Sequence, residues 1–205
     1  MATSNQSMLA PEGRPIVTVV AALILVAHFF LGIKVLLLWL LPGLLLWLYR
    51  DPPRDIPAAP RGLLSPVDAR VVAIEEDDDP YLQRRAIRVD LRIPVTAVYT
   101  LRSVTEGKIM NQWCRGSSGR ARTLALWLQT DESDDIVTVL KPGRVLGSLK
   151  CYARSGERVG QGQRQGFILL GTDVQMLLPT GVRLRIATGD KVLAGADIIA
   201  DLVHG

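Results

Sequence analysis

Cysteine is scarce in this 205-residue sequence, which contains Cys114 and Cys151 and no others. The two form no CxxC pair and no spacing typical of metal ligands, so we predict no zinc site. We also predict that both are reduced thiols, because disulfides are uncommon in the cytoplasm, where the domain is placed below.

Aromatic residues are also few, at 5% of the chain. The net charge is +4 and the isoelectric point is about 9.3, which is compatible with a nucleic-acid partner. However, the basic residues are scattered and no aromatic residues alternate with them, so we predict no nucleic-acid binding. A basic domain beside anionic lipid headgroups explains the charge more simply.

One long apolar run dominates the N-terminal quarter of the chain. Within residues 16–49, only His28, Lys34 and the pair Pro42–Gly43 resist burial. A helix of these 34 residues would be about 51 Å long, whereas the apolar core of a bilayer is about 30 Å thick. We therefore predict a membrane anchor over 16–49, after a tail over 1–15. We interpret the anchor as a helical hairpin, and a single tilted span is the alternative.

Basic residues flank both ends of this run: Arg14 precedes it, and Arg50, Arg54 and Arg61 follow it. Positive charge beside a membrane segment favours the cytoplasmic side. We therefore expect an anchor in the cell (inner) membrane, with the soluble domain on the cytoplasmic side. We reject a cleaved signal peptide, because the run is too long and no small-residue cleavage site follows it.

A proline-rich segment separates the anchor from the rest of the chain. Residues 51–60 contain four prolines, which exclude a helix and favour a stiff, extended linker. We place this linker at 50–62 and a folded domain at 63–205. Two acidic runs in the domain, Glu75–Asp79 and Asp131–Asp135, are interpreted as solvated loops, since neither has the spacing of a calcium loop.

The domain is predicted to be mainly β. Short apolar runs of strand length are separated by Gly, Pro and Asp, and no stretch after residue 60 shows a helical period. The expected strands are 70–74, 86–91, 95–101, 124–128, 136–140, 144–152, 167–170, 174–178 and 182–186. Many short strands with turns between them favour a barrel or sandwich, here preceded by a transmembrane helical segment.

Several stretches are more specific than generic strands and turns. In chain order they are Tyr49–Arg54 (YRDPPR) with Leu64–Asp68 (LSPVD), Tyr99–Lys108 (YTLRSVTEGK), and Gly160–Gly166 (GQGQRQG) with the following FILLGTDVQMLLP and Gly189–Gly195 (GDKVLAG). Taken together and in this order, they resemble the motifs of the phosphatidylserine decarboxylase family, in its short membrane-anchored form. The resemblance extends over nearly the whole chain. Each motif alone is weak, since GDxVxAG also occurs in biotinyl and lipoyl modules.

The resemblance implies a specific chemistry. Members of the family cut their own backbone before a serine, which becomes an N-terminal pyruvoyl group on the small C-terminal fragment. The carbonyl of that group reacts with the substrate amine and accepts the electrons released as CO2 leaves, a role that pyridoxal phosphate has in other decarboxylases. The implied partner is a membrane phospholipid, without a metal. A homodimer is the protein assembly that we consider.

The aspartate of the family's SPxDG motif corresponds to Asp68, although Ala69 replaces the glycine. The resemblance implies that Asp68 is catalytic, and the alternative is an Asx-turn after Pro66. The family's histidine corresponds to Tyr99. A phenol, which titrates near pH 10, is a poor base at neutral pH. The alternative for Tyr99 is a packed strand aromatic.

The cleavage serine corresponds to Thr172, so the implied cut lies between Gly171 and Thr172. A threonine hydroxyl can attack the preceding carbonyl in the same way, and elimination would leave a 2-oxobutanoyl group instead of pyruvoyl. Alternatively, Thr172 is a plain strand or turn residue. Arg102 corresponds to an arginine of the family's HVNRSP-like stretch. It either holds a phosphate or carboxylate of the substrate or pairs with an acidic loop.

Three functions follow from these residues. The first is a decarboxylase that converts phosphatidylserine to phosphatidylethanolamine in phospholipid biosynthesis. The second is a non-catalytic membrane-bound relative that binds phospholipid or a partner, since Tyr99 and Thr172 replace the family's histidine and serine. The third, a membrane-tethered carrier module, ranks last because Lys191 is in the wrong place for a biotin or lipoate attachment site.

Overall fold

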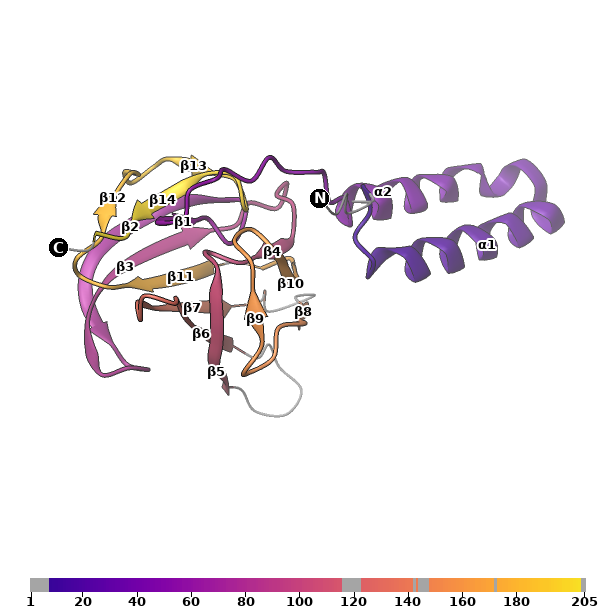
Figure 1. Cartoon of the computed structure of the whole chain (residues 1–205). Helices are drawn as coiled ribbons and strands as arrows, with labels where there is room; N and C mark the ends of the chain where they lie inside the picture. Colours follow the sequence, from indigo (N-terminus) through magenta and orange to yellow (C-terminus); the bar gives the residue numbers. More distant parts are fainter. Residues whose placement is uncertain (1–7, 116–122, 142, 144–147, 172, 204–205) are drawn as a thin grey trace. The chain divides into compact units, whose positions relative to one another are not determined.

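The structure of the protein is a computed structural model that describes residues 8–115, 123–141, 143, 148–171 and 173–203. The chain divides between Pro53 and Arg54 into two compact units, which are described separately (Figure 1). This division lies inside the proline-rich segment that the sequence predicts as a linker.

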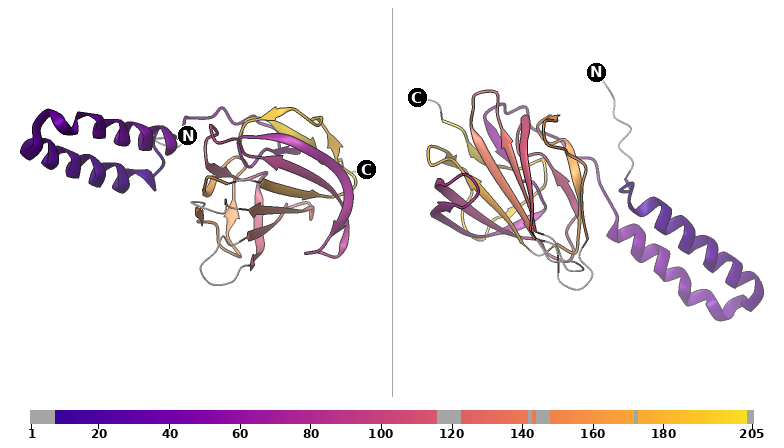
Figure 2. Two further views of the ribbon diagram at one scale, coloured as in Figure 1. Left: turned by 180° about the vertical axis from the view of Figure 1, so that it is seen from behind. Right: turned by 90° about the horizontal axis from the view of Figure 1, so that it is seen from below.

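The N-terminal unit contains two antiparallel helices. α1 (Gly13–Leu31) leads through the 3₁₀ helix η1 (Gly32–Trp39) into α2 (Leu40–Leu48), and α1 and α2 lie side by side (Figure 1 and Figure 2). The flanking residues are also joined. The Ala10 N–H donates to the Tyr49 carbonyl at 2.8 Å, and the Asp51 N–H donates to the Met8 carbonyl at 2.8 Å. Both ends of the apolar segment therefore lie together.

A glycine marks the point where the chain turns back. Gly32 adopts a φ of +60°, in the left-handed region that favours glycine, directly after α1. Lys34 follows two residues later, within η1. Pro42 lies in the first turn of α2, where a proline removes no helical hydrogen bond. The Pro42–Gly43 pair therefore does not interrupt the helical segment.

The surface of this unit is apolar. Phe29 is 84% exposed, Ile33 79% and Leu37 78%. By length and composition, the helical segment Gly13–Leu48 is able to cross a membrane. Because contact with water disfavours such a large apolar surface, the segment suits membrane anchoring. The prediction of an apolar helical segment in front of a β domain is confirmed.

The second unit is mainly β, and its described residues contain no helix. Its strands are β1 (Gly62–Leu64), β2 (Ala69–Asp79), β3 (Arg84–Arg92), β4 (Thr100–Arg102), β5 (Gly107–Arg115), β6 (Thr123–Gln129), β7 (Asp135–Lys141), β8 (Ser148–Cys151), β9 (Arg158–Val159), β10 (Arg164–Leu169), β11 (Asp173–Leu178), β12 (Arg183–Leu184), β13 (Lys191–Val192) and β14 (Ile198–Asp201). The predicted mainly β fold class is confirmed.

The described strands form three antiparallel sheets. The largest has the order β13-β2-β3-β11-β7-β6-β5-β9 and curls into a half-barrel (Figure 2). The two small sheets have the orders β1-β14-β12 and β4-β10-β8. Apolar side chains from all three sheets form the core, and the fully buried ones include Leu63, Val89, Leu101, Ile109, Ile168, Met176 and Ile199.

The acidic run Glu75–Asp79 forms the second half of strand β2, so its interpretation as a loop is wrong. Its residues face an arginine-rich part of β3, with Glu75 opposite Arg88 and Asp78 opposite Arg85. Cross-strand pairs of opposite charge stabilise a sheet. Tertiary pairing here overrides the low strand propensity of Asp and Glu.

Other strand predictions also differ from the structure, and residues 144–147 of the expected strand 144–152 lie outside the described residues. In the expected strand 95–101, the Ala97 N–H instead donates to the Pro94 carbonyl at 2.9 Å in a turn, and strand pairing begins at Thr100. Strand β5 was not expected, because polar residues such as Asn111 interrupt its apolar alternation. A register shift between β5 and β6 next to this residue explains the broken period.

Candidate active site

The stretch Leu64–Asp68 lies between two other stretches that resemble family motifs. The Arg102 N–H donates to the Pro66 carbonyl at 2.9 Å, which joins this stretch to the end of β4. The Gly195 N–H donates to the Ser65 carbonyl at 2.8 Å, which joins it to the GDKVLAG stretch. Backbone hydrogen bonds thus assemble segments that are up to 130 positions apart in the sequence.

The glycine-rich stretch Gly160–Gly166 reaches the same place. The Ser103 N–H donates to the Gln163 carbonyl at 2.7 Å, and the Gly162 N–H donates back to the Ser103 carbonyl at 3.0 Å. Nη1 of Arg102 donates to the Gly162 carbonyl at 3.3 Å. One hydrogen-bonded assembly therefore contains four of the motif stretches: Leu64–Asp68, Tyr99–Lys108, Gly160–Gly166 and Gly189–Gly195.

Asp68 is buried in this assembly, with 8% of its surface exposed. Its Oδ2 accepts a hydrogen bond from Nη2 of Arg54 at 2.7 Å, and its Oδ1 accepts one from the Ala194 N–H at 2.8 Å. Both partners lie far from Asp68 in sequence, unlike those of an Asx-turn. A charge-assisted pair of this kind fixes the orientation of the carboxylate.

Arg54 is a site residue that sequence reasoning missed, since it was used only as a flanking positive charge. The signal that could have found it is its position in the Tyr49–Arg54 motif. The segment after it is also held on the β domain. The side chain of Ile56 covers Gly162, and Nε2 of Gln161 donates to the Ala59 carbonyl at 2.7 Å.

Arg102 is 5% exposed and packs against the GDKVLAG stretch. A Cβ atom on Gly195 would lie 2.6 Å from Cδ of Arg102, and Gly195 adopts a φ of +70°. Both observations require glycine at this position. We call Arg54, Asp68, Arg102 and Gly195 the Asp68–Arg102 cluster.

Tyr99 is 1% exposed and belongs to the core. Its hydroxyl donates to the Val95 carbonyl at 2.6 Å, and its ring meets Phe167 edge to face, with centroids 6.3 Å apart. The Tyr99 carbonyl accepts a hydrogen bond from the Ile168 N–H at 2.8 Å. The geometry is that of a packed strand aromatic, and a hydroxyl that donates to a carbonyl is not arranged as a base.

Thr172, the implied cleavage residue, lies outside the described residues, but its neighbours on both sides are described. Leu170 adopts a φ of +48°, which is unfavourable for a residue with a side chain. A Cβ atom on Gly171 would lie 2.6 Å from Cγ1 of Ile168 and 3.0 Å from Cδ1 of Ile93. The chain here leaves β10, in a small sheet, and enters β11, in the large one.

The register of the large sheet shows where Asp68 lies relative to the chain between β10 and β11. Arg70 of β2 lies opposite Arg92 of β3, and Arg92 lies opposite Asp173 of β11. Strands β2 and β11 therefore begin at the same end of the sheet, with β3 between them. Two strand spacings amount to about 10 Å. The fold thus places Asp68 at the same end of the sheet as Asp173, about two strand spacings away.

Neither cysteine belongs to the Asp68–Arg102 cluster. Both are free thiols in the described structure, with Cys114 exposed and Cys151 partly buried. Burial raises the pKa of the Cys151 thiol to about 11. Among the described residues, no three His, Cys, Asp or Glu side chains are placed to hold a metal ion.

The fold and the site define a class of protein: a β domain with a buried aspartate–arginine site, attached to an apolar helical segment. Residues 90–200 match the family model described as Phosphatidylserine decarboxylase. The chain is 35% identical to the Phosphatidylserine decarboxylase proenzyme of Nitrosomonas eutropha, with 95% of each chain covered. It is also 35% identical to that of Aromatoleum aromaticum, over 95% of this chain and 96% of the relative. The chain therefore belongs to the phosphatidylserine decarboxylase family. No solved structure matches it.

Proposed function

We propose that this protein is a membrane-anchored phosphatidylserine decarboxylase that matures by cutting its own chain between Gly171 and Thr172. The observation that carries the proposal is the sheet register, in which β2, directly after Asp68, and β11, which begins at Asp173, start at the same end of the sheet. Asp68 is buried and forms an ion pair with Arg54, which fixes its position at this end of the sheet. The relatives named above are proenzymes of this activity.

The turn before the proposed cut supports the same site. A left-handed conformation costs a residue with a side chain about 1–2 kcal/mol, and Leu170 adopts it with a φ of +48°. Gly171 is then confined between Ile168 and Ile93, where a side chain would not fit. Strain that cleavage can release favours reaction at the peptide bond that follows.

The proposed cleavage conserves atoms and charge as follows. Oγ1 of Thr172 attacks the carbonyl carbon of Gly171, the C–N bond of that peptide breaks, and the hydroxyl proton passes to the freed nitrogen, which leaves an ester. Loss of the Thr172 Cα proton then breaks the Cβ–Oγ1 bond and releases Gly171 as a carboxylate. Addition of water and loss of ammonia convert the remaining residue into a 2-oxobutanoyl group. Asp68 is our candidate proton acceptor.

The buried charges of Asp68 and Arg102 suit a site that forms a 2-oxoacyl group at residue 172 and binds a charged substrate. Such a group supplies the electron acceptor for decarboxylation. Arg102, which is buried beside Gly195, provides positive charge for the carboxylate or phosphate of a phosphatidylserine headgroup. The apolar segment Gly13–Leu48 would keep the domain beside this substrate. The flanking arginines favour the cytoplasmic side of the cell membrane.

A second function is favoured by one observation. The hydroxyl of Tyr99 donates to the Val95 carbonyl and is buried, so this position supplies no base where the family has a histidine. If cleavage does not occur, the protein is a non-catalytic relative that keeps the fold and binds anionic phospholipid.

The mass of the purified full-length protein separates the two functions. A decarboxylase is expected to give two fragments, the smaller spanning residues 172–205 and blocked at its N-terminus. A single chain of 22.4 kDa would instead establish the non-catalytic relative. Thr172→Ala should abolish cleavage, whereas the control Thr180→Ala, in a surface turn, should leave it unchanged. Continued cleavage of Thr172→Ala would show that the cut is elsewhere.

The double variant Tyr99→His with Thr172→Ser restores the family pattern. If the wild-type chain stays whole and this variant is cut, the rest of the site is competent and only these two residues prevent processing. If neither is cut, the surrounding site has also lost its function.

A further inference from the structure

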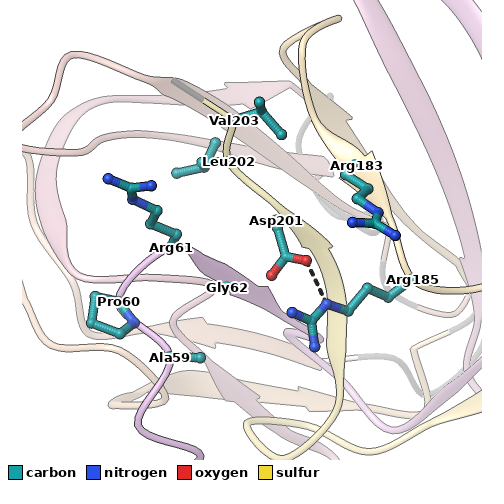
Figure 3. Close-up of a pocket in the computed structure, with 9 residues that line it drawn as sticks. All are labelled: Ala59, Pro60, Arg61, Gly62, Arg183, Arg185, Asp201, Leu202 and Val203. Carbon is teal, nitrogen blue, oxygen red and sulfur yellow. Dashed lines mark hydrogen bonds and ion pairs between the residues drawn. The ribbon is translucent and has the colours of Figure 1, made fainter. Parts of the chain in front are cut away.

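A pocket lies in the β domain, at the sheet β1-β14-β12 (Figure 3). Its volume is about 530 Å³. Three arginines line it, Arg61, Arg183 and Arg185, together with Asp201 and apolar residues that include Leu202. The Asp68–Arg102 cluster contributes none of these residues.

The sheet register explains why the arginines meet here. Arg183 of β12 and Gly62 of β1 both lie opposite Asp201 of β14, one on each side. Side chains of directly opposite residues share a face of the sheet, and so do residues two positions apart, such as Arg183 and Arg185. The open space of the pocket lies among Arg61, Gly62 and Asp201. Figure 3 shows Arg61 on one side of this space and Arg183 and Arg185 on the other.

Positive charge exceeds negative charge in the pocket. Arg185 forms an ion pair with Asp201. In the part of the chain that the structure describes, the side chains of Arg61 and Arg183 form no ion pair and no hydrogen bond. The four charged groups that line the pocket therefore carry a net charge of +2, and two guanidinium groups are available to a ligand.

The pocket is separate from the candidate active site. Ser65 and Asp197, which adjoin the Asp68–Arg102 cluster, lie at one end of the paired strands β1 and β14. Gly62 and Asp201 lie at the other end. Three residues of extended strand correspond to about 10 Å. A ligand in the pocket would thus leave the candidate active site free.

We infer that this pocket binds a phosphate-bearing anion, either the headgroup of an anionic phospholipid or a free phosphate. Guanidinium groups present paired N–H donors that match the oxygens of phosphate, and three of them border one open space. The apolar lining residues Pro60, Leu202 and Val203 suit the start of the acyl chains of a lipid. This inference does not depend on the proposed decarboxylase activity.

The first test measures binding of inorganic phosphate to the full-length chain in a non-ionic detergent by calorimetry. The triple variant Arg61→Gln, Arg183→Gln, Arg185→Gln should weaken binding by about tenfold or more, since it removes the guanidinium donors. The control triple Arg85→Gln, Arg154→Gln, Arg158→Gln changes the net charge equally at exposed sites outside the pocket, and should change the dissociation constant by less than about twofold. Equal losses in both triples would overturn the inference.

The second test uses a change that is expected to strengthen phosphate binding. Asp201→Asn removes the carboxylate that neutralises Arg185, so it should strengthen phosphate binding about three- to tenfold at low salt. The control Asp131→Asn, which removes the exposed partner of Arg158, should leave binding unchanged. No change or weaker binding with Asp201→Asn would contradict the inference.

A third measurement identifies the source of the phosphate. The full-length chain in mixed micelles of phosphatidylglycerol is compared with the chain in micelles of phosphatidylcholine. If phosphatidylglycerol competes with inorganic phosphate in the wild type but not in the arginine triple variant, the ligand is a lipid headgroup. Phosphate binding that is the same in both micelles supports free phosphate. If neither ligand binds, the inference is wrong.

Discussion

Two regions of the β domain resemble the phosphatidylserine decarboxylase family, and they differ in what they have kept. The Asp68–Arg102 cluster has the aspartate and arginine that the family pattern implies. Its contacts are one largely buried ion pair, between Arg54 and Asp68, and the close packing of Arg102 against Gly195. At positions 99 and 172, Tyr99 and Thr172 replace the histidine and the serine that the family pattern implies.

This difference between the two regions shows which residues of a site are also required for folding. Changing Asp68 or Gly195 would leave a buried charge or a steric overlap, so folding constrains them whatever the chemistry. Tyr99 fills the core and satisfies its hydroxyl with the Val95 carbonyl, so a tyrosine there costs little stability. A catalytic residue is therefore replaced most easily where the new side chain also packs well.

The largest effect is expected for Asp68→Asn. This change leaves the mostly buried Arg54 guanidinium without its anionic partner, and should lower the free energy of unfolding by about 3 kcal/mol. The measurement is thermal unfolding of the full-length chain in detergent. The control Asp131→Asn breaks the exposed pair with Arg158 and should cost less than about 1 kcal/mol. Equal costs would mean that the cluster does not hold the domain together.

An intermediate effect is expected for Gly195→Ala. The added Cβ would overlap Arg102 and force an unfavourable φ, so we expect a loss of about 2 kcal/mol in the same unfolding measurement. Gly181→Ala is the matched control, because no atom lies within 4 Å of the added Cβ there. A Gly195→Ala variant as stable as this control would show that Arg102 moves freely.

The smallest effect is expected for Tyr99→Phe, at the other region. It removes the hydrogen bond to the Val95 carbonyl and should cost about 1 kcal/mol, while the ring keeps its contact with Phe167. The rate at which the chain is cut, followed by intact mass, should not change. A slower rate at unchanged stability would assign Tyr99 a part in the chemistry and remove the contrast between the two regions.

The sequence predicted features that depend on local pattern. A long apolar run is visible wherever it lies, and short alternating runs such as Ala86–Leu91 become strands because one face must be buried. The acidic strand residues Glu75–Asp79 were misinterpreted, because what holds them in β2 is the arginines of β3, which no local pattern reveals.

The candidate site also combines features that the sequence predicts with features that depend on tertiary structure. The order of the motifs is a property of the chain, and it was sufficient to indicate the family and to single out Asp68, Arg102 and Thr172. The partners of these residues were not predictable. Arg54 and the Ala194 N–H reach Asp68 from 14 and 126 positions away, through strand pairing that the sequence does not display.

The sequence by itself determined that an apolar segment precedes a β domain with the ordered motifs of phosphatidylserine decarboxylases, because hydrophobicity and motif order are carried residue by residue. Only the tertiary structure decided that Asp68 is held by Arg54, that the Tyr99 hydroxyl is occupied by a carbonyl, and that three arginines border a separate pocket. The pocket depends on the register of β1, β14 and β12, which is set by the packing of the whole domain.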